Sequence, residues 1–248
     1  MNLRKLILTN NACYKAGRTI TPQGIMVHST GANNPWLRRY VGPDDGLLGV
    51  NRHNNHWNQE RPGGRSVCVH AFIGRLADGS VATYQTLPWN HRGWHCGRGV
   101  RGSGNDTHIS FEICEDNLTG AAYFHKVYDE AVELCVHLCG QFGLTEVDII
   151  SHSEGFRLGI ASNHADVMHW FPRHGKSMDS FRADVRKALA ESAAPVLAYE
   201  IYTVAKGDSL WQIAAARLGS GARHHEISEL NALSFGTLVP GQKLKIPK

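Results

Sequence analysis

Alternating apolar and polar residues predict several β-strands in the first part of the chain. The clearest run is 107–115, where every second residue is apolar and the positions between include His108 and Glu112. Three further β-rich runs are 24–30 with His28, 66–74 with His70, and 147–152, which ends on His152. An Asp-Gly pair at 78–79 follows the second of these runs and predicts a hairpin turn.

Two longer runs carry apolar residues at the three- and four-residue spacing of a helix. The run 123–144 keeps this spacing throughout and contains Gly143 as a plausible stop. The run 177–191 opens on Ser177, a residue type favoured at helix N-caps. Because strands mixed with long helices are typical of α/β domains, we expect a central mixed β-sheet flanked by helices.

The composition changes once, at the Ala-rich stretch 188–200, which contains a single Pro and little patterning. We therefore expect a large domain at 1–190, a linker at 191–200 and a small domain at 201–248. Within the small domain, "YTV" and "QKLKI" predict strands, while Ser209 caps one helix and "HEISELNAL" forms another. The expected order is βααβ.

Composition and charge narrow the function classes. The chain is 42% apolar and 19% charged, as in an ordinary globular protein. Its net charge of +4 and pI of about 8.8 suit association with an anionic polymer. No concentrated run of Lys and Arg is present, which argues against nucleic acid as the partner. We expect a monomer.

The cysteines and the N-terminal residues bear on the cellular compartment. The six cysteines form no CxxC pair, and a chain of this length does not need disulfides, so we expect reduced thiols. We expect Cys135 and Cys139, four apart on a predicted helix, to be core residues. The apolar stretch at 6–8 is too short for a secretory signal, and no apolar run reaches membrane length. We expect synthesis and retention in the cytoplasm, without membrane insertion, until another process releases the protein.

Histidine is unusually frequent, at 15 residues, which prompts a search for a metal or acid–base site. His28 and His152 each lie at the end of a β-rich run, and strand ends at one sheet edge commonly build sites. The segment after His152 adds His164, Asp166 and His169. Two imidazoles and a carboxylate suit catalytic zinc, which takes three protein ligands and keeps a fourth position for water.

The order of these motifs resembles one enzyme family. "GIMVHST", "VCVHAFIGRLADGSV", "RGWHCG", "NDTHISFEICE" and "ISH" with a downstream "HAD" are similar to the type 2 N-acetylmuramoyl-L-alanine amidases. These are zinc enzymes that share the fold of the peptidoglycan recognition proteins. The resemblance covers residues 20–187. It implies hydrolysis of the amide between the lactyl group of N-acetylmuramic acid and L-alanine in peptidoglycan.

The resemblance also implies roles for individual residues. His28, His152 and Asp166 match the Zn²⁺ ligands. Glu112 matches the acidic residue that handles the attacking water, and His164 falls where relatives carry a Lys that supports the transition state. The expected substrate-binding residues of this domain are His70, Trp94, His95 and Asn105.

One departure concerns the third ligand. The gap between His152 and Asp166 is longer than the family usually has, and Val167 stands where relatives often carry Pro. An enlarged loop, "SEGFRLGIA", accounts for the gap, but it leaves His164 and His169 as alternative ligands.

The C-terminal residues resemble a second family. Residues 202–247 are similar to a LysM module over their full length, which implies binding to glycans that contain N-acetylglucosamine. The expected contacts are the "NALSFGTLVP" loop and Gly207, Asp208, Ser209 and Leu210. Both regions point to bacterial peptidoglycan, and together they imply an endolysin of phage or prophage type, or an autolysin.

Two other classes remain as alternatives. A non-catalytic peptidoglycan-binding protein of the recognition type would lack zinc. A cysteine peptidase of the wall would need a Cys at a helix N-terminus with a partner histidine, whereas Cys68 and Cys114 lie inside predicted strands and Cys96 lies in a Gly-rich loop after His95.

Overall fold

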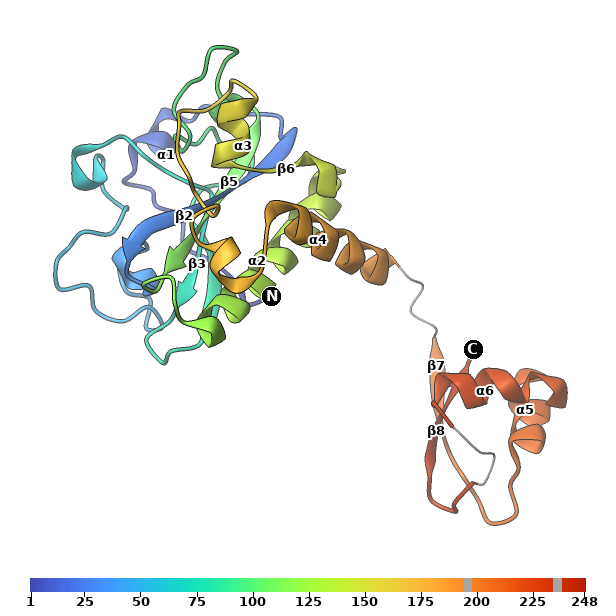
Figure 1. The fold of residues 1–248 in the computed structure, drawn as a ribbon. Helices are drawn as coiled ribbons and strands as arrows, with labels where there is room; N and C mark the ends of the chain where they lie inside the picture. Colours follow the sequence, from blue (N-terminus) through green and yellow to red (C-terminus); the bar gives the residue numbers. More distant parts are fainter. Residues whose placement is uncertain (194–197, 234–237) are drawn as a thin grey trace. The chain divides into compact units, whose positions relative to one another are not determined.

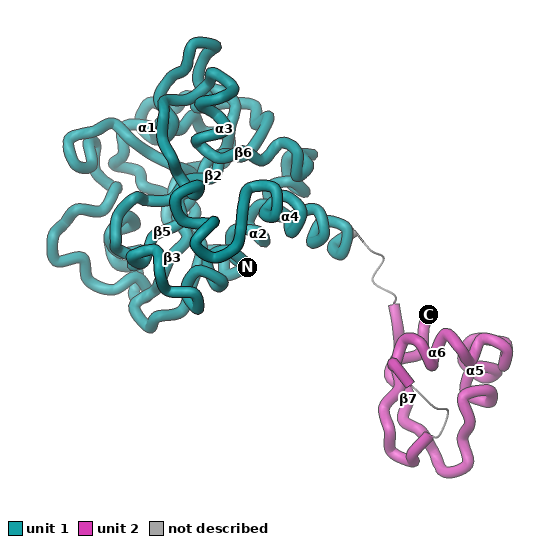
Figure 2. Tube along the Cα trace, in the orientation of Figure 1, with its two compact units in different colours: residues 1–192 teal, residues 193–248 magenta. Residues whose placement is uncertain are grey.

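A computed structural model describes residues 1–193, 198–233 and 238–248 (Figure 1). The chain divides into two compact units, residues 1–192 and residues 193–248 (Figure 2). The expected linker and the "NALSFGTLVP" loop both fall partly outside the described residues. None of the described helices is long and apolar enough to cross a membrane.

The first unit is built on a six-stranded sheet of order β1-β4-β3-β5-β2-β6. The strands are β1 (Leu3–Lys5), β2 (Gly24–Asn33), β3 (Ala71–Arg75), β4 (Val81–Gln85), β5 (His108–Glu115) and β6 (Ile149–Ser151). The β3–β4 pair is antiparallel and is joined by the Asp78-Gly79 turn, whereas the other neighbours are parallel. The expected mixed sheet and hairpin are therefore confirmed.

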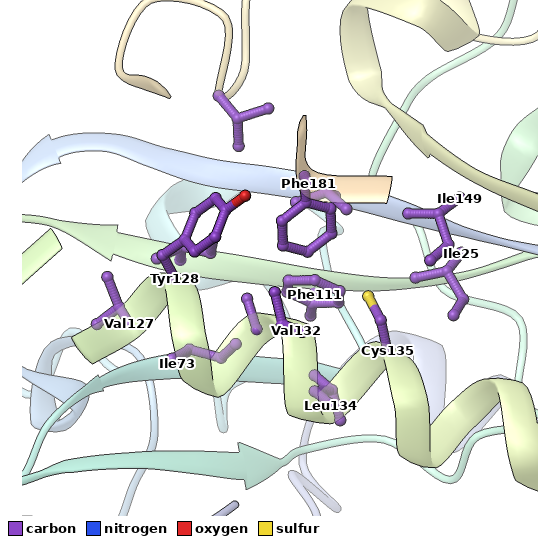
Figure 3. Close-up of a cluster of buried hydrophobic side chains, with 14 of the residues drawn as sticks. Ile25, Ile73, Phe111, Val127, Tyr128, Val132, Leu134, Cys135, Ile149 and Phe181 are labelled. Carbon is purple, nitrogen blue, oxygen red and sulfur yellow. The ribbon is translucent and has the colours of Figure 1, made fainter. Parts of the chain in front are cut away.

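Helices lie on both faces of this sheet. They are α1 (Ala12–Ala16), α2 (Ala121–Phe142), α3 (His152–Arg157) and α4 (Met178–Ala193). The main core joins Ile25, Phe111 and other sheet residues to α2 and to Phe181 of α4 (Figure 3). Burial of such a continuous apolar surface is the main stabilising term of the fold. Helix α2 ends at Gly143 with a φ of 66°, as the sequence predicts.

Strand alternation sends the functional side chains to the opposite face. Ile25 and Val27 point into the main core, while Met26 between them packs in a separate cluster with Cys96 and Ala161. His28, two positions after Met26, therefore lies on the face that α2 does not cover. The same alternation in β5 places Glu112 on this face.

The second unit has its own core and the expected βααβ order. Its elements are β7 (Tyr199–Thr203), α5 (Leu210–Leu218), α6 (His224–Leu230) and β8 (Lys243–Pro247). The two strands pair antiparallel. Ser209 caps α5 through a reciprocal bond with Gln212. Leu210 is 8% exposed and packs with Ile213, so it belongs to the core of this unit.

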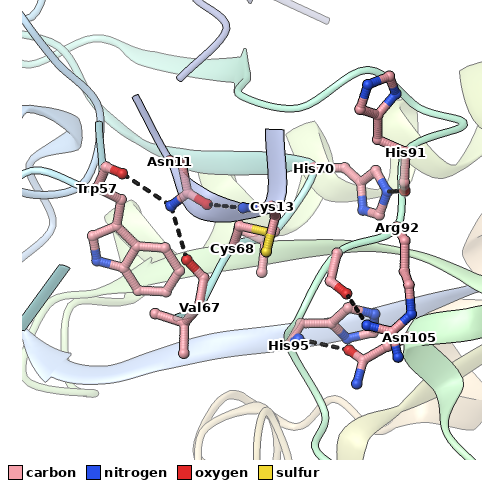
Figure 4. Close-up of a disulfide and its surroundings, with 12 residues drawn as sticks. Asn11, Cys13, Trp57, Val67, Cys68, His70, His91, Arg92, His95 and Asn105 are labelled. Carbon is pink, nitrogen blue, oxygen red and sulfur yellow. Dashed lines mark hydrogen bonds between the residues drawn. A yellow bond between two sulfur atoms is a disulfide. The ribbon is translucent and has the colours of Figure 1, made fainter. Parts of the chain in front are cut away.

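A disulfide joins Cys13 to Cys68, which corrects the expectation of reduced thiols throughout (Figure 4). The two residues are 55 positions apart in sequence, so no local pattern announces the pair. Their Cα atoms lie 6.4 Å apart because α1 packs beside the segment that precedes β3. Cys135 and Cys139 are free and buried in the main core, as expected.

Candidate metal centre

Three side chains converge at the edge of the face that α2 does not cover. His28 lies in β2, His152 is the first residue of α3, and Asp166 lies in the following turn. Nδ1 of His28 and Nδ1 of His152 each lie 3.0 Å from Oδ2 of Asp166, and the two nitrogens are 3.1 Å apart. These three residues form the group of possible metal ligands found among the described residues.

Hydrogen bonds determine which nitrogen of the His152 ring carries the hydrogen. The hydroxyl of Ser162 donates to the carbonyl of Cys96 at 3.1 Å, so its oxygen accepts from Nε2–H of His152 at 3.3 Å. In the neutral ring, Nδ1 of His152 then carries a lone pair directed at the centre.

The His28 ring is placed in the same way. Its Nε2 lies 2.9 Å from Nδ1 of His95 and its Nδ1 faces the centre. Burial lowers the pKa of His28, which favours its neutral form. When Nε2–H of His28 donates to Nδ1 of His95, two lone pairs and a carboxylate converge with no proton between them, and such a donor set suits a cation. Ligand atoms around tetrahedral zinc lie roughly 3.3 Å apart, close to the separations seen here. The residues present therefore fit a zinc ion.

Asp166 remains charged in this setting. Burial acts to raise the pKa of Asp166, but the rings of His152 and His28, each 3.0 Å from its Oδ2, outweigh burial and bring the pKa below its usual value. The neighbouring Val167 has a φ of 58°, which is unusual for a β-branched residue, and its N–H bonds to Oγ of Ser29 at 3.3 Å. This contact anchors the turn that carries Asp166 onto β2.

The two alternative ligands lie elsewhere. His164 is exposed and stacks on His152 with ring centroids 4.8 Å apart. Nε2 of His169 lies 2.9 Å from a carboxylate oxygen of the buried Glu115. Neither side chain belongs to the converging group.

Glu112 lies beside the three converging side chains. Its Cα is the register partner of His28 across β2 and β5. Its buried Oε2 has no hydrogen-bond partner among the described residues. Burial, followed by the charges of Asp166 and Glu115, raises the pKa of Glu112 well above its usual value. A carboxyl whose pKa is raised holds a proton more readily than an exposed glutamate does, which suits a general acid–base group.

A pocket of about 450 Å³ opens over these groups. It is lined by Glu112, His152, His164 and Asp166 together with Trp94, His95, Trp57, Arg65 and residues of the loops around them. Nε2 of His95 is buried and has no partner among the described residues. If His28 donates to Nδ1 of His95, that Nε2 carries a hydrogen available to a ligand.

Two of the expected substrate-binding residues are structural instead. Asn105 is fully buried, and its side chain accepts from the N–H of His95 at 2.7 Å and donates to the carbonyl of Gly97 at 2.8 Å (Figure 4). It holds the loop that carries His95.

His70 is also fully buried. Its Nδ1 accepts from the N–H of Ser110 at 3.0 Å, and its Nε2 donates to the carbonyl of His91 at 2.8 Å. Burial lowers the pKa of His70 to about 4. Polar residues near a site look alike in sequence whether they face the pocket or the loops behind it.

Of the four residues expected to contact glycan in the second unit, two line a hollow and two do not. Gly207 and Asp208 line a hollow of about 500 Å³ with Tyr202, Arg217 and neighbours on α5. Ser209 serves as a helix cap, and Leu210 is a core residue whose side chain is not available to a ligand.

Sequence inspection missed Ser162, Ser29 and Arg65. Ser162 orients His152, Ser29 anchors the Asp166 turn, and Arg65 lines the pocket. Single serines and arginines carry no motif, so their roles become visible only when distant segments are brought together.

Two known protein families match this chain, one in each of its two units. The family profile described as N-acetylmuramoyl-L-alanine amidase matches residues 18–170, and the LysM domain profile matches residues 202–247. The N-acetylmuramoyl-L-alanine amidase XlyA of Bacillus subtilis (strain 168) is 31% identical over 156 residues. That alignment covers 63% of this chain and 44% of the relative, so the chain matches less than half of the relative's length.

Solved structures share the fold of the first unit. The catalytic domain of XlyA aligns with a TM-score of 0.51 at 24% identity, over 75% of this chain and 99% of that domain. The PlyG catalytic domain aligns with a TM-score of 0.53 at 21% identity, over 79% and 100% of the two chains.

Proposed function

Since this chain belongs to the N-acetylmuramoyl-L-alanine amidase family, we propose that it cleaves the amide between the lactyl group of N-acetylmuramic acid and L-alanine in peptidoglycan. The reaction depends on zinc held by His28, His152 and Asp166. The observation that carries this proposal is the convergence of three ligand atoms at 3.0–3.1 Å beside the unpaired carboxyl of Glu112.

The chemistry of an amide explains why such a group is needed. An amide carbonyl is a poor electrophile, and bound zinc supplies both a Lewis acid and a water of lowered pKa. Glu112 accepts a proton from the attacking water and delivers it to the leaving amine, a role that its raised pKa suits. His164 and Nε2–H of His95 line the same pocket and donate to the carbonyl oxygen as negative charge develops.

The chain's cysteines favour this proposal over a cysteine peptidase. Cys96 is fully buried, and burial raises the pKa of its thiol to about 11. A nucleophilic cysteine needs the opposite shift, toward the thiolate. The ligand set and Glu112 likewise favour catalysis over a purely binding role.

The second unit tethers the enzyme to its substrate. We infer that this LysM domain binds the N-acetylglucosamine-containing glycan, with Gly207 and Asp208 at the contact. Tethering raises the local enzyme concentration at an insoluble wall. The protein acts as a monomer, as an endolysin or autolysin that reaches the wall after release from the cytoplasm.

Mass spectrometry of fragments released from purified Gram-positive walls tests the reaction. The expected products are free stem peptides that begin at L-alanine, lost with a chelator and restored by zinc. Cleavage within the peptide or the glycan would overturn the assigned reaction. Absence of cleavage with zinc restored would favour the binding protein.

A further inference from the structure

A second pocket of about 620 Å³ adjoins the active-site pocket. The two pockets share Arg65, Val67 and Trp94 as lining residues, so they adjoin at this wall. The second pocket then extends to α1 and Arg18, away from the metal ligands. Nothing in the proposed chemistry uses this extension.

The pocket is held open by its backbone. The N–H and carbonyl groups of Cys68 and Trp94 bond to each other in both directions at 3.1 Å. The N–H of Arg92 bonds to the carbonyl of Arg18 at 2.8 Å. The disulfide from Cys13 to Cys68 ties α1 to the same wall (Figure 4). A ligand therefore meets a preformed surface and does not have to order these segments.

The lining combines cationic and apolar groups. Among the described residues, none of those that line the pocket is acidic. Arg92 is already paired with Asp106 at 2.6 Å and lies over the ring of Trp94. Arg18 and Arg65, in contrast, form no ion pair with the described residues, and both are exposed. Trp94, 41% exposed, contributes a free aromatic surface.

We propose that this pocket binds the stem peptide of the substrate, with a free carboxylate of the stem at Arg18 and Arg65. This inference rests on the proposed function, because it assumes peptidoglycan in the neighbouring pocket. Around the cleaved bond the glycan is uncharged, whereas carboxylates belong to the stem peptide. Arginine binds carboxylates in two-point geometry, and the apolar wall at Val67 and Trp94 suits the methyl groups of alanine residues. The enzyme therefore prefers stems with free carboxylates over amidated stems.

Steady-state kinetics with two soluble N-acetylmuramoyl-peptides tests this preference. The peptides differ only in whether their stem carboxyl groups are free or amidated. For the free acid, the Arg18→Gln/Arg65→Gln double variant should raise KM about tenfold or more and change kcat little, since charge-assisted bonds are lost. For the amidated stem, KM should stay within about twofold of wild type. Lys15→Gln, which removes an exposed charge from α1 outside the pocket, serves as the matched control.

Two outcomes would overturn the pocket assignment. One is an equal change in KM for both substrates, and the other is an equal effect of Lys15→Gln. A calorimetric titration of released stem peptide into the zinc-loaded Glu112→Gln protein separates this proposal from the proposed function. If the stem peptide binds and its affinity falls when Arg18→Gln and Arg65→Gln are added to Glu112→Gln, the pocket assignment is supported even if no cleavage occurs. Absence of binding refutes the pocket even if cleavage occurs.

Discussion

His28 and Glu112 face each other across the parallel strands β2 and β5, as register partners on the face that α2 leaves uncovered. The sheet thus places the proposed metal ligand and the proposed proton-transferring carboxyl side by side without help from a loop. A slip of one residue in either strand would turn its side chain into the main core.

Replacing a ligand should remove zinc, whereas replacing its neighbours should not. We expect His28→Ala and Asp166→Ala to lose bound zinc, because each removes a converging atom. His164→Ala and His169→Gln should keep it. Metal content measured on purified protein checks this set, and loss of zinc from His169→Gln with retention in Asp166→Ala would reassign the third ligand.

Glu112→Gln should separate metal binding from chemistry. The amide cannot accept a proton from water, so we expect turnover to fall by roughly 10²–10⁴-fold. Zinc content should match wild type, since Glu112 is not among the converging ligand atoms. The comparison uses rates on a soluble muramoyl-peptide, and near-normal turnover would remove Glu112 from the mechanism.

Acid should destabilise the protein through His70. Its pKa falls from 6.5 to about 4 on folding, so unfolded chains take up a proton between these values while folded chains do not. Stability present above pH 6.5 is therefore lost as the pH falls toward 4, by up to about 3 kcal/mol. Protonation would also set a second N–H against the N–H of Ser110.

The variant His70→Gln can keep both hydrogen bonds and cannot titrate. Denaturant unfolding at several pH values should show a shallower loss of stability in this variant. Part of the dependence of stability on pH should remain in this variant, because burial also lowers the pKa of His108 to about 4. His125 is exposed, so His125→Gln is the control. If His125→Gln reduced the pH dependence of stability as much as His70→Gln, the effect could not be assigned to His70.

Reduction of the disulfide should lower stability. Opening a loop of 55 residues between Cys13 and Cys68 restores chain entropy to the unfolded state, worth about 4 kcal/mol in a chain-entropy estimate. Unfolding midpoints with and without a phosphine reductant measure the effect. The Cys13→Ser/Cys68→Ser double variant should be insensitive to the reductant, and an unchanged wild-type midpoint would show that the crosslink contributes nothing.

Removing residues 193–248 should lower activity on insoluble substrate but not on soluble substrate. Each unit has its own core, so the first unit should keep its activity on a soluble muramoyl-peptide. On purified walls, we expect activity to fall by roughly tenfold or more as the tether is lost. Equal loss on both substrates would instead indicate that the second unit supports the fold of the first.

Strand pattern and motif order were sufficient to predict much of this protein. Alternation in β5 indicated that Glu112 faces away from the apolar residues of that strand, and the core confirms this placement. The βααβ order of the second unit followed from local signals such as the Ser209 cap.

Long-range relationships were not predictable in the same way. The pairing of Cys13 with Cys68 depends on how α1 packs, and no local pattern records that packing. Asn105 and Leu210 have side chains of plausible type near the expected sites, but burial turns one toward a loop backbone and the other into a core.

The sequence distance between His28 and Asp166, 138 residues, has a consequence for biosynthesis. A growing chain carries His28 early but lacks Asp166 until most of the first unit has been made. Prematurely terminated chains that stop before residue 166 therefore lack one of the three converging side chains. The order of synthesis thus keeps the converging group incomplete until the first unit is nearly finished.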